Sequence, residues 1–300
     1  MNKPTIHPYI PIAIGVLTVG LSAIFVKLAT ADAGVIAFYR MFFSAVIMLP
    51  LFLISYRSEL TTLTKREWLF TASSGIFLAI HFILWFESLN YTSVASSTVL
   101  VTLQPVFALA GTALFFKEII TGKMLTAVLV ALTGSFIISW GDFQVSGAAL
   151  FGDILALLAC AFVTAYLLIG QNVRKRISLV TYTFLVYSVS SVALFIYVLA
   201  IQEPFTGYPS SDWGWFLALA ILPNLLGHTL FNWAVKWVST NVVSIAILFE
   251  PVLASIAAYF VLHEKITTLQ LIGAIVVLTG ILLFIIDVKS IKKKLFTKNT

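Results

Sequence analysis

Charge is scarce in this 300-residue chain, since only 10% of its residues are Asp, Glu, Lys or Arg. A soluble domain carries about 25% charged residues, so these are too few to cover the surface of a water-soluble globule of this length. Hydrophobic residues make up 60% of the chain, and the mean hydropathy is +1.05. The composition therefore predicts an integral membrane protein that is solvated mainly by lipid.

The chain contains one cysteine, Cys160, so it can form no intrachain disulfide. The net charge of +6 does not indicate a nucleic-acid partner, because the basic residues form no basic domain. They lie in short loops and in the C-terminal tail, which is typical of membrane topology.

Long apolar runs fill the chain, separated by charged and turn-forming residues. A helix of about 20 apolar residues crosses the hydrocarbon core, whereas a membrane β-barrel needs alternating polar and apolar residues. The run that begins at Tyr9 is too long for the apolar part of a signal peptide, so we expect it to stay as a helix. We predict an all-α fold with ten transmembrane helices at residues 8–29, 34–56, 67–88, 93–116, 123–140, 148–170, 178–201, 212–235, 241–262 and 268–287.

Lys and Arg indicate the orientation of these helices, because cytoplasmic loops are enriched in both. With the N-terminus inside, every Lys and Arg beside a span falls on the inner side except Lys265. We therefore expect both termini in the cytoplasm and the protein in the cell membrane. Residues 288–300 then form a basic tail at the anionic inner leaflet.

An internal duplication divides the chain into residues 8–140 and 148–287. The first copy reads Gln104-Pro105-Val106, Glu118-Ile119-Ile120-Thr121 and Leu132-Thr133-Gly134, and the second reads Glu250-Pro251-Val252, Glu264-Lys265-Ile266-Thr267 and Leu278-Thr279-Gly280. Each half contains five predicted spans. Because five is odd, the second half enters the membrane from the opposite side, which predicts an inverted repeat. Two such half-bundles can exchange conformations at similar energy, as alternating access requires.

These features resemble the EamA type of the drug/metabolite transporter superfamily. The points of similarity are the two five-helix halves, the proline in the fourth span of each (Pro105, Pro251), Arg40 in the second span, Glu118 and Glu264 after the fourth and ninth, Leu-x-Gly in the fifth and tenth, and the segment from Ser88 to Ala95. The resemblance covers about residues 9–287. It implies a secondary carrier for small metabolites, often an exporter of amino acids or related compounds. Two positions depart from symmetry: Gln104 stands opposite Glu250, and Lys117 opposite His263.

Polar side chains inside the predicted spans are the candidate substrate-binding residues, since such groups usually face the interior of a bundle. Two sets share a helix face each: His81, Trp85 and Ser88 in the third span, and Asn224, His228 and Asn232 in the eighth. These spans occupy matching places in the two halves, so we expect their polar faces to meet at the central axis. The alternative is that each side chain only bonds a neighbouring helix.

Charged residues within the spans add two candidates. Arg40 lies deeper than a membrane anchor needs and is a candidate partner for an acid or a substrate carboxylate. Glu250 lies near the middle of the ninth span, where an ionised carboxylate is costly unless it is paired or protonated. We weigh proton coupling or binding of a substrate amine against a structural hydrogen bond beside Pro251.

Prolines and small residues predict how the helices bend and pack. Pro105 and Pro251 each remove a helical hydrogen bond, so each is either a static kink or a hinge for gating. Glu118 and Glu264 are expected to be caps or ion-pair partners rather than ligands. Small residues at 127–134 and 273–280 allow close helix packing within the chain or, alternatively, in a homodimer.

An intramembrane enzyme that acts on a lipid or a peptide is the alternative function. His263-Glu264 lacks the second histidine of a metalloprotease motif, and no glycine-rich loop precedes Lys-Ser or Lys-Thr as in nucleotide-binding proteins. We therefore expect no catalytic residues, no metal and no cofactor. The expected partners are a small-molecule substrate and the lipid bilayer.

Overall fold

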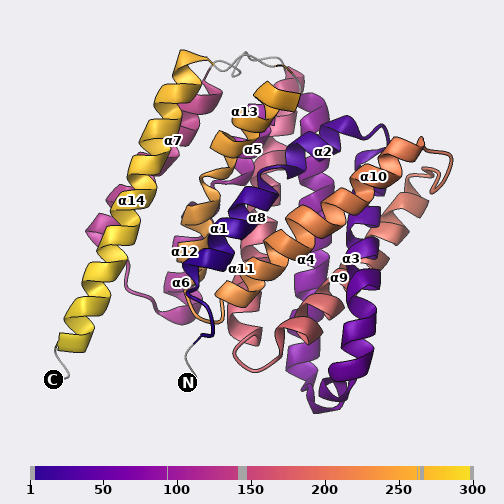
Figure 1. Cartoon of the computed structure of the whole chain (residues 1–300), viewed down its shortest axis with the longest axis horizontal. Coiled ribbons are helices and arrows are strands. Elements are labelled where there is room, and N and C mark those ends of the chain that lie inside the picture. The colour runs from indigo at the N-terminus through magenta and orange to yellow at the C-terminus, as the bar shows by residue number, and fades with distance from the viewer. Residues whose placement is uncertain (1–3, 93, 141–146, 262, 264–266, 298–300) are drawn as a thin grey trace.

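The computed structural model describes residues 4–92, 94–140, 147–261, 263 and 267–297, and all regular elements in these residues are helical. The first helix begins and the last helix ends on the same face of the molecule (Figure 1). We call this the terminal face and the other end of the bundle the opposite face. Lys3, Glu264 and Lys265 lie outside the described residues.

The helices follow the apolar runs of the sequence. They are α1 (Tyr9–Val19), α2 (Ser22–Leu28), α3 (Ala33–Ser55), η1 (Arg57–Thr62), α4 (Lys65–Tyr91), α5 (Val94–Val101), α6 (Gln104–Phe116), α7 (Gly122–Ser139), α8 (Gly147–Val173), α9 (Leu179–Ala200), α10 (Ser210–Leu219), η2 (Ala220–His228), α11 (Thr229–Ala234), α12 (Thr240–Ile247), α13 (Glu250–Val261) and α14 (Thr268–Thr297).

The predicted all-helical membrane class is confirmed, and the chain is a multi-pass membrane protein. Among the described residues, eight helical segments are long and apolar enough to cross a membrane: Tyr9–Leu28, Ala33–Ser55, Lys65–Tyr91, Ser96–Phe116, Gly147–Val173, Leu179–Ala200, Ser210–Ala234 and Thr240–Val261. The predicted spans at 123–140 and 268–287 lie on α7 and α14, where the apolar stretches among the described side chains are Gly122–Ile137 and Leu271–Phe284.

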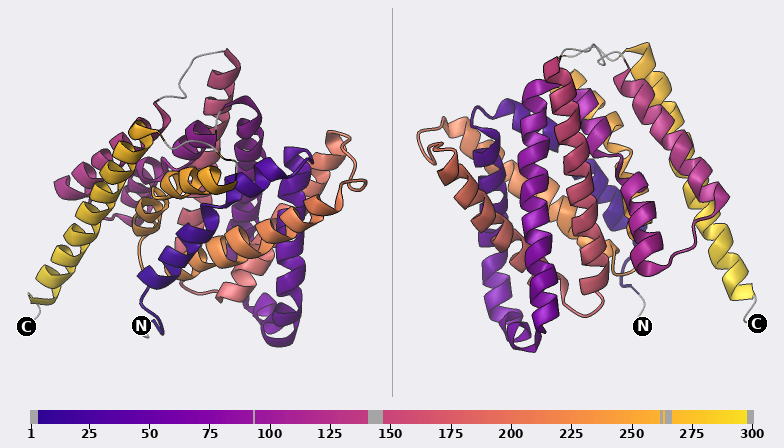
Figure 2. Two further views of the ribbon diagram at one scale, coloured as in Figure 1. Left: turned by 45° about the horizontal axis from the view of Figure 1, so that its top comes forward. Right: turned by 180° about the vertical axis from the view of Figure 1, so that it is seen from behind.

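Corresponding helices of the two halves pack on one another. α3 packs on α9, and α7 packs on α14, which are the second and fifth predicted spans of each half. α4 packs on α8, and α1 packs on η2 and α11, so the third span of each half packs on the first span of the other. Figure 2 shows α4 beside α8 on the back of the molecule and the α7–α14 pair at its edge. The packing has the two-fold character of a two-repeat architecture.

Small residues allow α7 and α14 to approach closely. A Cβ atom added to Gly134 would lie 2.5 Å from the backbone nitrogen of Val277, and one added to Gly280 would lie 2.5 Å from that of Ala131. The small residues singled out in the sequence therefore mediate packing inside the chain.

Two helices are broken at corresponding places. The helix of the fourth predicted span stops at Val101 and resumes at Gln104, while that of the ninth stops at Ile247 and resumes at Glu250. Each proline is the second residue of the resumed helix, where its missing N–H costs little. The prolines thus begin new helices instead of kinking continuous ones, and the two breaks define the centre of the molecule.

Candidate functional site

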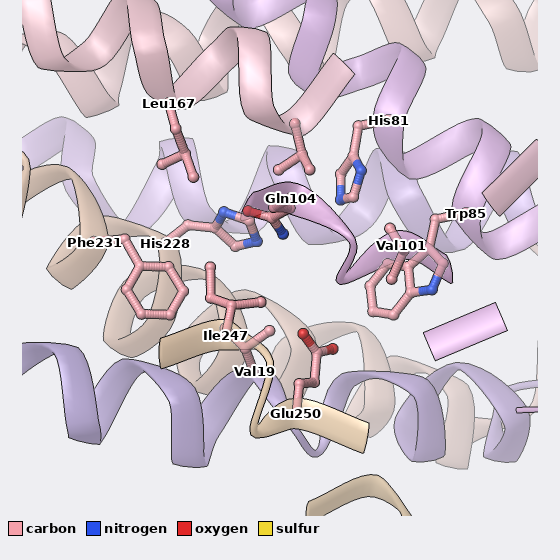
Figure 3. A pocket seen from close by; sticks show the side chains of 11 residues that line it. Val19, His81, Trp85, Val101, Gln104, Leu167, His228, Phe231, Ile247 and Glu250 are labelled. Atoms are coloured by element: carbon pink, nitrogen blue, oxygen red, sulfur yellow. The ribbon is translucent and has the colours of Figure 1, made fainter. Parts of the chain in front are cut away.

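A small buried cavity lies where the two broken helices meet α1, α4, α8, η2 and α11 (Figure 3). Its lining is Val19, His81, Trp85, Val101, Gln104, Val163, Leu167, His228, Phe231, Ile247 and Glu250. Four of these residues flank the breaks: the last residue of α5 and of α12, and the first of α6 and of α13. Both resumed helices begin at the cavity, so their positive dipole ends lie there.

Two imidazoles and an indole form one side of the cavity. The His81 ring stacks on Trp85 with 5.7 Å between centroids, and its centroid is 6.4 Å from that of His228. His81 Nδ1 lies 3.0 Å from the carbonyl oxygen of Ala159, which can only accept, so Nδ1 carries the proton. Trp85 Nε1 and His228 Nδ1 have no hydrogen-bond partner among the described residues. The wall therefore combines aromatic surface with polar atoms that a ligand can use.

Glu250 and Gln104 bring polar groups from the broken helices. Glu250 is 4% exposed and lines the cavity. In Figure 3 it points into the space between the indole and the imidazoles. Gln104 Oε1 is buried without a partner in the described residues. Because unpartnered buried polar groups are costly, their convergence is typical of a site that binds a polar ligand.

Arg40 is fully buried behind this site and does not line the cavity. Its Nη1 donates to Ser22 Oγ at 2.8 Å, and the guanidinium carbon lies 4.1 Å from the centroid of the Phe82 ring. Nε and Nη2 have no partner within the described residues. Arg40 and Glu250 act on each other electrostatically, although no ion pair joins them in the described structure.

Ser88 and Asn224 lie outside the cavity lining and join structural elements instead. Ser88 Oγ donates to the carbonyl oxygen of Trp85 at 2.6 Å and shares a 2.6 Å hydrogen bond with Ser97 Oγ. Asn224 Nδ2 donates to Ser44 Oγ at 2.8 Å and thereby links η2 to α3. These contacts match the alternative interpretation, in which a polar group bonds its neighbours.

Asn232 positions the residues around His228. Its Nδ2 donates to the carbonyl oxygen of His228 at 2.8 Å and to the hydroxyl of Tyr166. The segment Ala220–His228 is a π-helix, whose wider turns change the angle between successive residues. Of the three polar residues of this span, only His228 lines the cavity.

Several lining residues were not among the predicted site residues. Gln104 carried a signal, because the duplication aligns it with Glu250. The apolar walls formed by Val19, Val163 and Leu167 carried none, since such side chains occur throughout the chain. The cavity has a volume of about 20 Å³, which is room for about one water molecule. A larger ligand can enter only if the surrounding helices move apart.

The sequence is similar to those of transporter proteins over most of its length. The model of the EamA-like transporter family matches residues 8–140 and again residues 150–286. An uncharacterized transporter of Archaeoglobus fulgidus is 26% identical over 274 residues, which cover 91% of this chain and 94% of that protein. The uncharacterized transporter sll1164 of Synechocystis sp. is 28% identical over 253 residues, covering 80% and 72%.

The crystal structure of another protein has the same fold. It superposes with a TM-score of 0.73 at 14% identity and covers 92% of this chain and 94% of its own. At this identity the likeness concerns the fold alone.

Proposed function

Because the chain belongs to the EamA-like transporter family, we propose that it is a secondary transporter of small metabolites such as amino acids and that its substrate binds in the cavity of Figure 3. One observation carries the proposal. Gln104 and Glu250, at the same position of the two broken helices, direct polar groups into one buried space. Discontinuous helices that meet near the middle of the bilayer are typical binding sites of secondary carriers.

We propose that transport uses alternating access between two inverted five-helix repeats, residues 8–140 and 148–287. The small cavity supports this mechanism, because a metabolite can bind only when the half-bundles separate on one side. Both termini are then cytoplasmic, the ten helices lie in the cell membrane, and the substrate moves outward. Pro105 and Pro251, beside the breaks, are the proposed hinges.

The groups around the cavity suit a zwitterion that carries an ammonium and a carboxylate. Glu250 is placed to meet the ammonium or to carry a coupling proton, and His81 with Trp85 offers a polar and aromatic wall. Arg40 has two unpartnered nitrogens and becomes available to a substrate carboxylate if Phe82 rotates away.

Reconstitution into proteoliposomes tests the proposal. Vesicles are loaded with a mixture of amino acids and related metabolites, and mass spectrometry identifies what crosses the membrane. We expect saturable flux of a chemically unchanged compound. Trp85→Ala should raise the half-saturating concentration about tenfold, the effect of losing roughly 1.4 kcal/mol of contact energy.

Trp140→Ala is the matched control, since Trp140 is 59% exposed at the end of α7 and away from the cavity. Equal kinetics in the two variants would remove Trp85 from the site. Recovery of a chemically altered compound would instead favour the alternative function, an intramembrane enzyme.

A further inference from the structure

Glu118 lies at the centre of a hydrogen-bond network whose residues do not line the cavity. It follows the end of α6, where Lys117 adopts a left-handed conformation with φ of 54°. The Glu118 backbone N–H bonds back to the carbonyl oxygen of Thr112 at 3.2 Å, which closes the helix end. Figure 1 shows this end of α6 beside the beginning of α12, near the terminal face.

The Glu118 carboxylate accepts hydrogen bonds from residues of the second half of the chain. Gln171 Nε2 donates to Oε1 at 3.1 Å, while Ser239 Oγ at 2.6 Å and Asn241 Nδ2 at 3.1 Å donate to Oε2. Hydrogen bonds to a carboxylate are stronger than those between neutral groups. One side chain of the first repeat is thus bound to α8 and to the beginning of α12.

Further bonds join the same residues into one network. Asn241 Nδ2 also donates to Thr112 Oγ1 at 2.8 Å, and Gln171 Oε1 accepts from the backbone N–H of Thr240 at 2.7 Å. Thr112, Thr240 and Asn241 are at most 2% exposed. The inner part of the network is therefore shielded from water, where hydrogen bonds are stronger, while Glu118 and Ser239 at its outer edge are partly exposed.

One buried face of α6 connects the cavity with this network. Gln104, Ala108 and Thr112 follow one another at helical spacing on one buried face of α6. Gln104 lines the cavity, and Thr112 belongs to the network. This face of α6 thus runs from the cavity to the terminal face.

The corresponding face of α13 ends differently. Glu250, Ala254 and Ala258 occupy the positions that match Gln104, Ala108 and Thr112 in the duplication, and all are buried. Ala257 and Ala258 pack against Ile24 of α2 in a small apolar cluster, whereas Glu264, the counterpart of Glu118, lies outside the described residues.

We propose that Glu118 is a gating residue that holds the substrate path shut on the terminal face. The proposal rests on the alternating access described above. Opening toward the terminal face must separate α6 from α8 and α12 and break the bonds to Glu118. Loss of Glu118 therefore shifts the protein toward opening on the terminal face.

Thiol accessibility tests the gate without a substrate. Ala108→Cys and Ala254→Cys place matched reporters on the two half-paths, and Cys160 is itself fully buried. A membrane-impermeant maleimide is applied to the face that carries a C-terminal tag, in intact cells or in inverted vesicles. Adding Glu118→Ala should speed labelling at position 108 about tenfold or more, as expected for losing a charge-assisted bond. Labelling at position 254 from the other face should stay constant or fall.

Two further sets of variants distinguish loss of a gate from a general weakening of helix packing. Asn241→Ala should resemble Glu118→Ala, and the double variant should add little because both residues belong to one network. Glu67→Ala is the control, since Glu67 caps α4 and pairs with Arg176 on the same face without touching α6.

Unchanged labelling at position 108 in the Glu118→Ala variant would overturn the gate, as would equal acceleration at positions 108 and 254. Glu118→Gln, which keeps the size of the side chain, guards against misfolding and should give an intermediate rate. If a substrate crosses the membrane but Glu118→Ala does not change labelling at position 108, the gate is rejected and the transport function stands. If Glu118→Ala changes labelling but none of the tested metabolites crosses, the gate stands and the proposed substrates are rejected.

Discussion

Glu250 and Gln104 occupy the same position in the two repeats, yet only Glu250 can carry a charge. Both side chains line the cavity, and Gln104 Oε1 has no hydrogen-bond partner in the described residues. A scaffold that is nearly symmetric in packing is therefore asymmetric in chemistry at its centre. We regard this difference as the origin of a direction in transport.

Glu250→Gln tests that idea, because it removes the charge and the titratable proton with little change in size. If Glu250 carries the coupling proton, flux through the variant should lose its dependence on pH and on the proton gradient. Proteoliposome flux at several pH values, with and without a gradient, measures this. Glu203→Gln, in the loop after α9, is the control. An identical pH dependence in the parent chain and in Glu250→Gln would leave Glu250 a structural role.

The sequence indicated which polar residues lie near the cavity, but it did not indicate which of them line it. His81, Trp85 and His228 were expected at one site, and the structure brings them together there. Ser88, Asn224 and Asn232 were selected by the same helical spacing but bond neighbouring groups. Spacing assigns a face of a regular helix, and it cannot reveal a π-helical segment or which neighbour a side chain bonds.

Among the helices, the broken pairs α5–α6 and α12–α13 determine where the cavity forms. Pro105 and Pro251 predicted a kink or a hinge, but each proline was expected inside one continuous helix. Proline is tolerated in the first turn of a helix, and it has no backbone N–H to donate to the carbonyl oxygen of the preceding turn. The chain therefore stops before each proline and restarts, and the residues beside the gap become the cavity wall.

Pro251→Ala tests whether the second break is a hinge. Alanine restores an N–H and permits a straighter helix, so the exchange between conformations should slow several-fold. The maximal flux should fall while the half-saturating concentration stays constant, because Pro251 does not line the cavity. Pro50→Ala, inside α3, is the control for a proline outside the site. A maximal flux equal to that of the parent chain would make the break static.

The α7–α14 pair yields a prediction about stability. In Gly280→Ala the new methyl group would meet the backbone of Ala131, and the helices must move apart. We expect a loss of about 1–3 kcal/mol, as for overpacked cores, seen as a lower thermal midpoint in detergent. Gly214→Ala should have little effect, because nothing lies within 4 Å of a Cβ atom there. Equal midpoints for the two variants would contradict the close packing.

For the molecule as a whole, the duplication predicted more than any single motif. The family model matches two stretches, residues 8–140 and 150–286, and α3 packs on α9 and α7 on α14. The sequence could not give the size of the cavity or the closure at Glu118. Both depend on contacts between residues far apart in the chain, such as Glu118 with Ser239.

Topology is a property of the whole chain, and the charge distribution predicts it. Because Lys and Arg gather on the side of the N-terminus, reporters fused after Thr300 should be active as a cytoplasmic fluorescent protein and inactive as a periplasmic enzyme. The opposite pattern would contradict a cytoplasmic C-terminus and therefore the model of ten spans with the N-terminus inside.

Alternating access requires that one cavity is reached in turn from both faces of the membrane. Ile247→Cys places a thiol in the cavity wall, where Ile247 is 4% exposed and the native Cys160 is fully buried. The account predicts that a membrane-impermeant thiol reagent reaches this position from either face, while the vesicles stay tight to ions. Labelling from one face only, or vesicles that leak, would contradict alternating access.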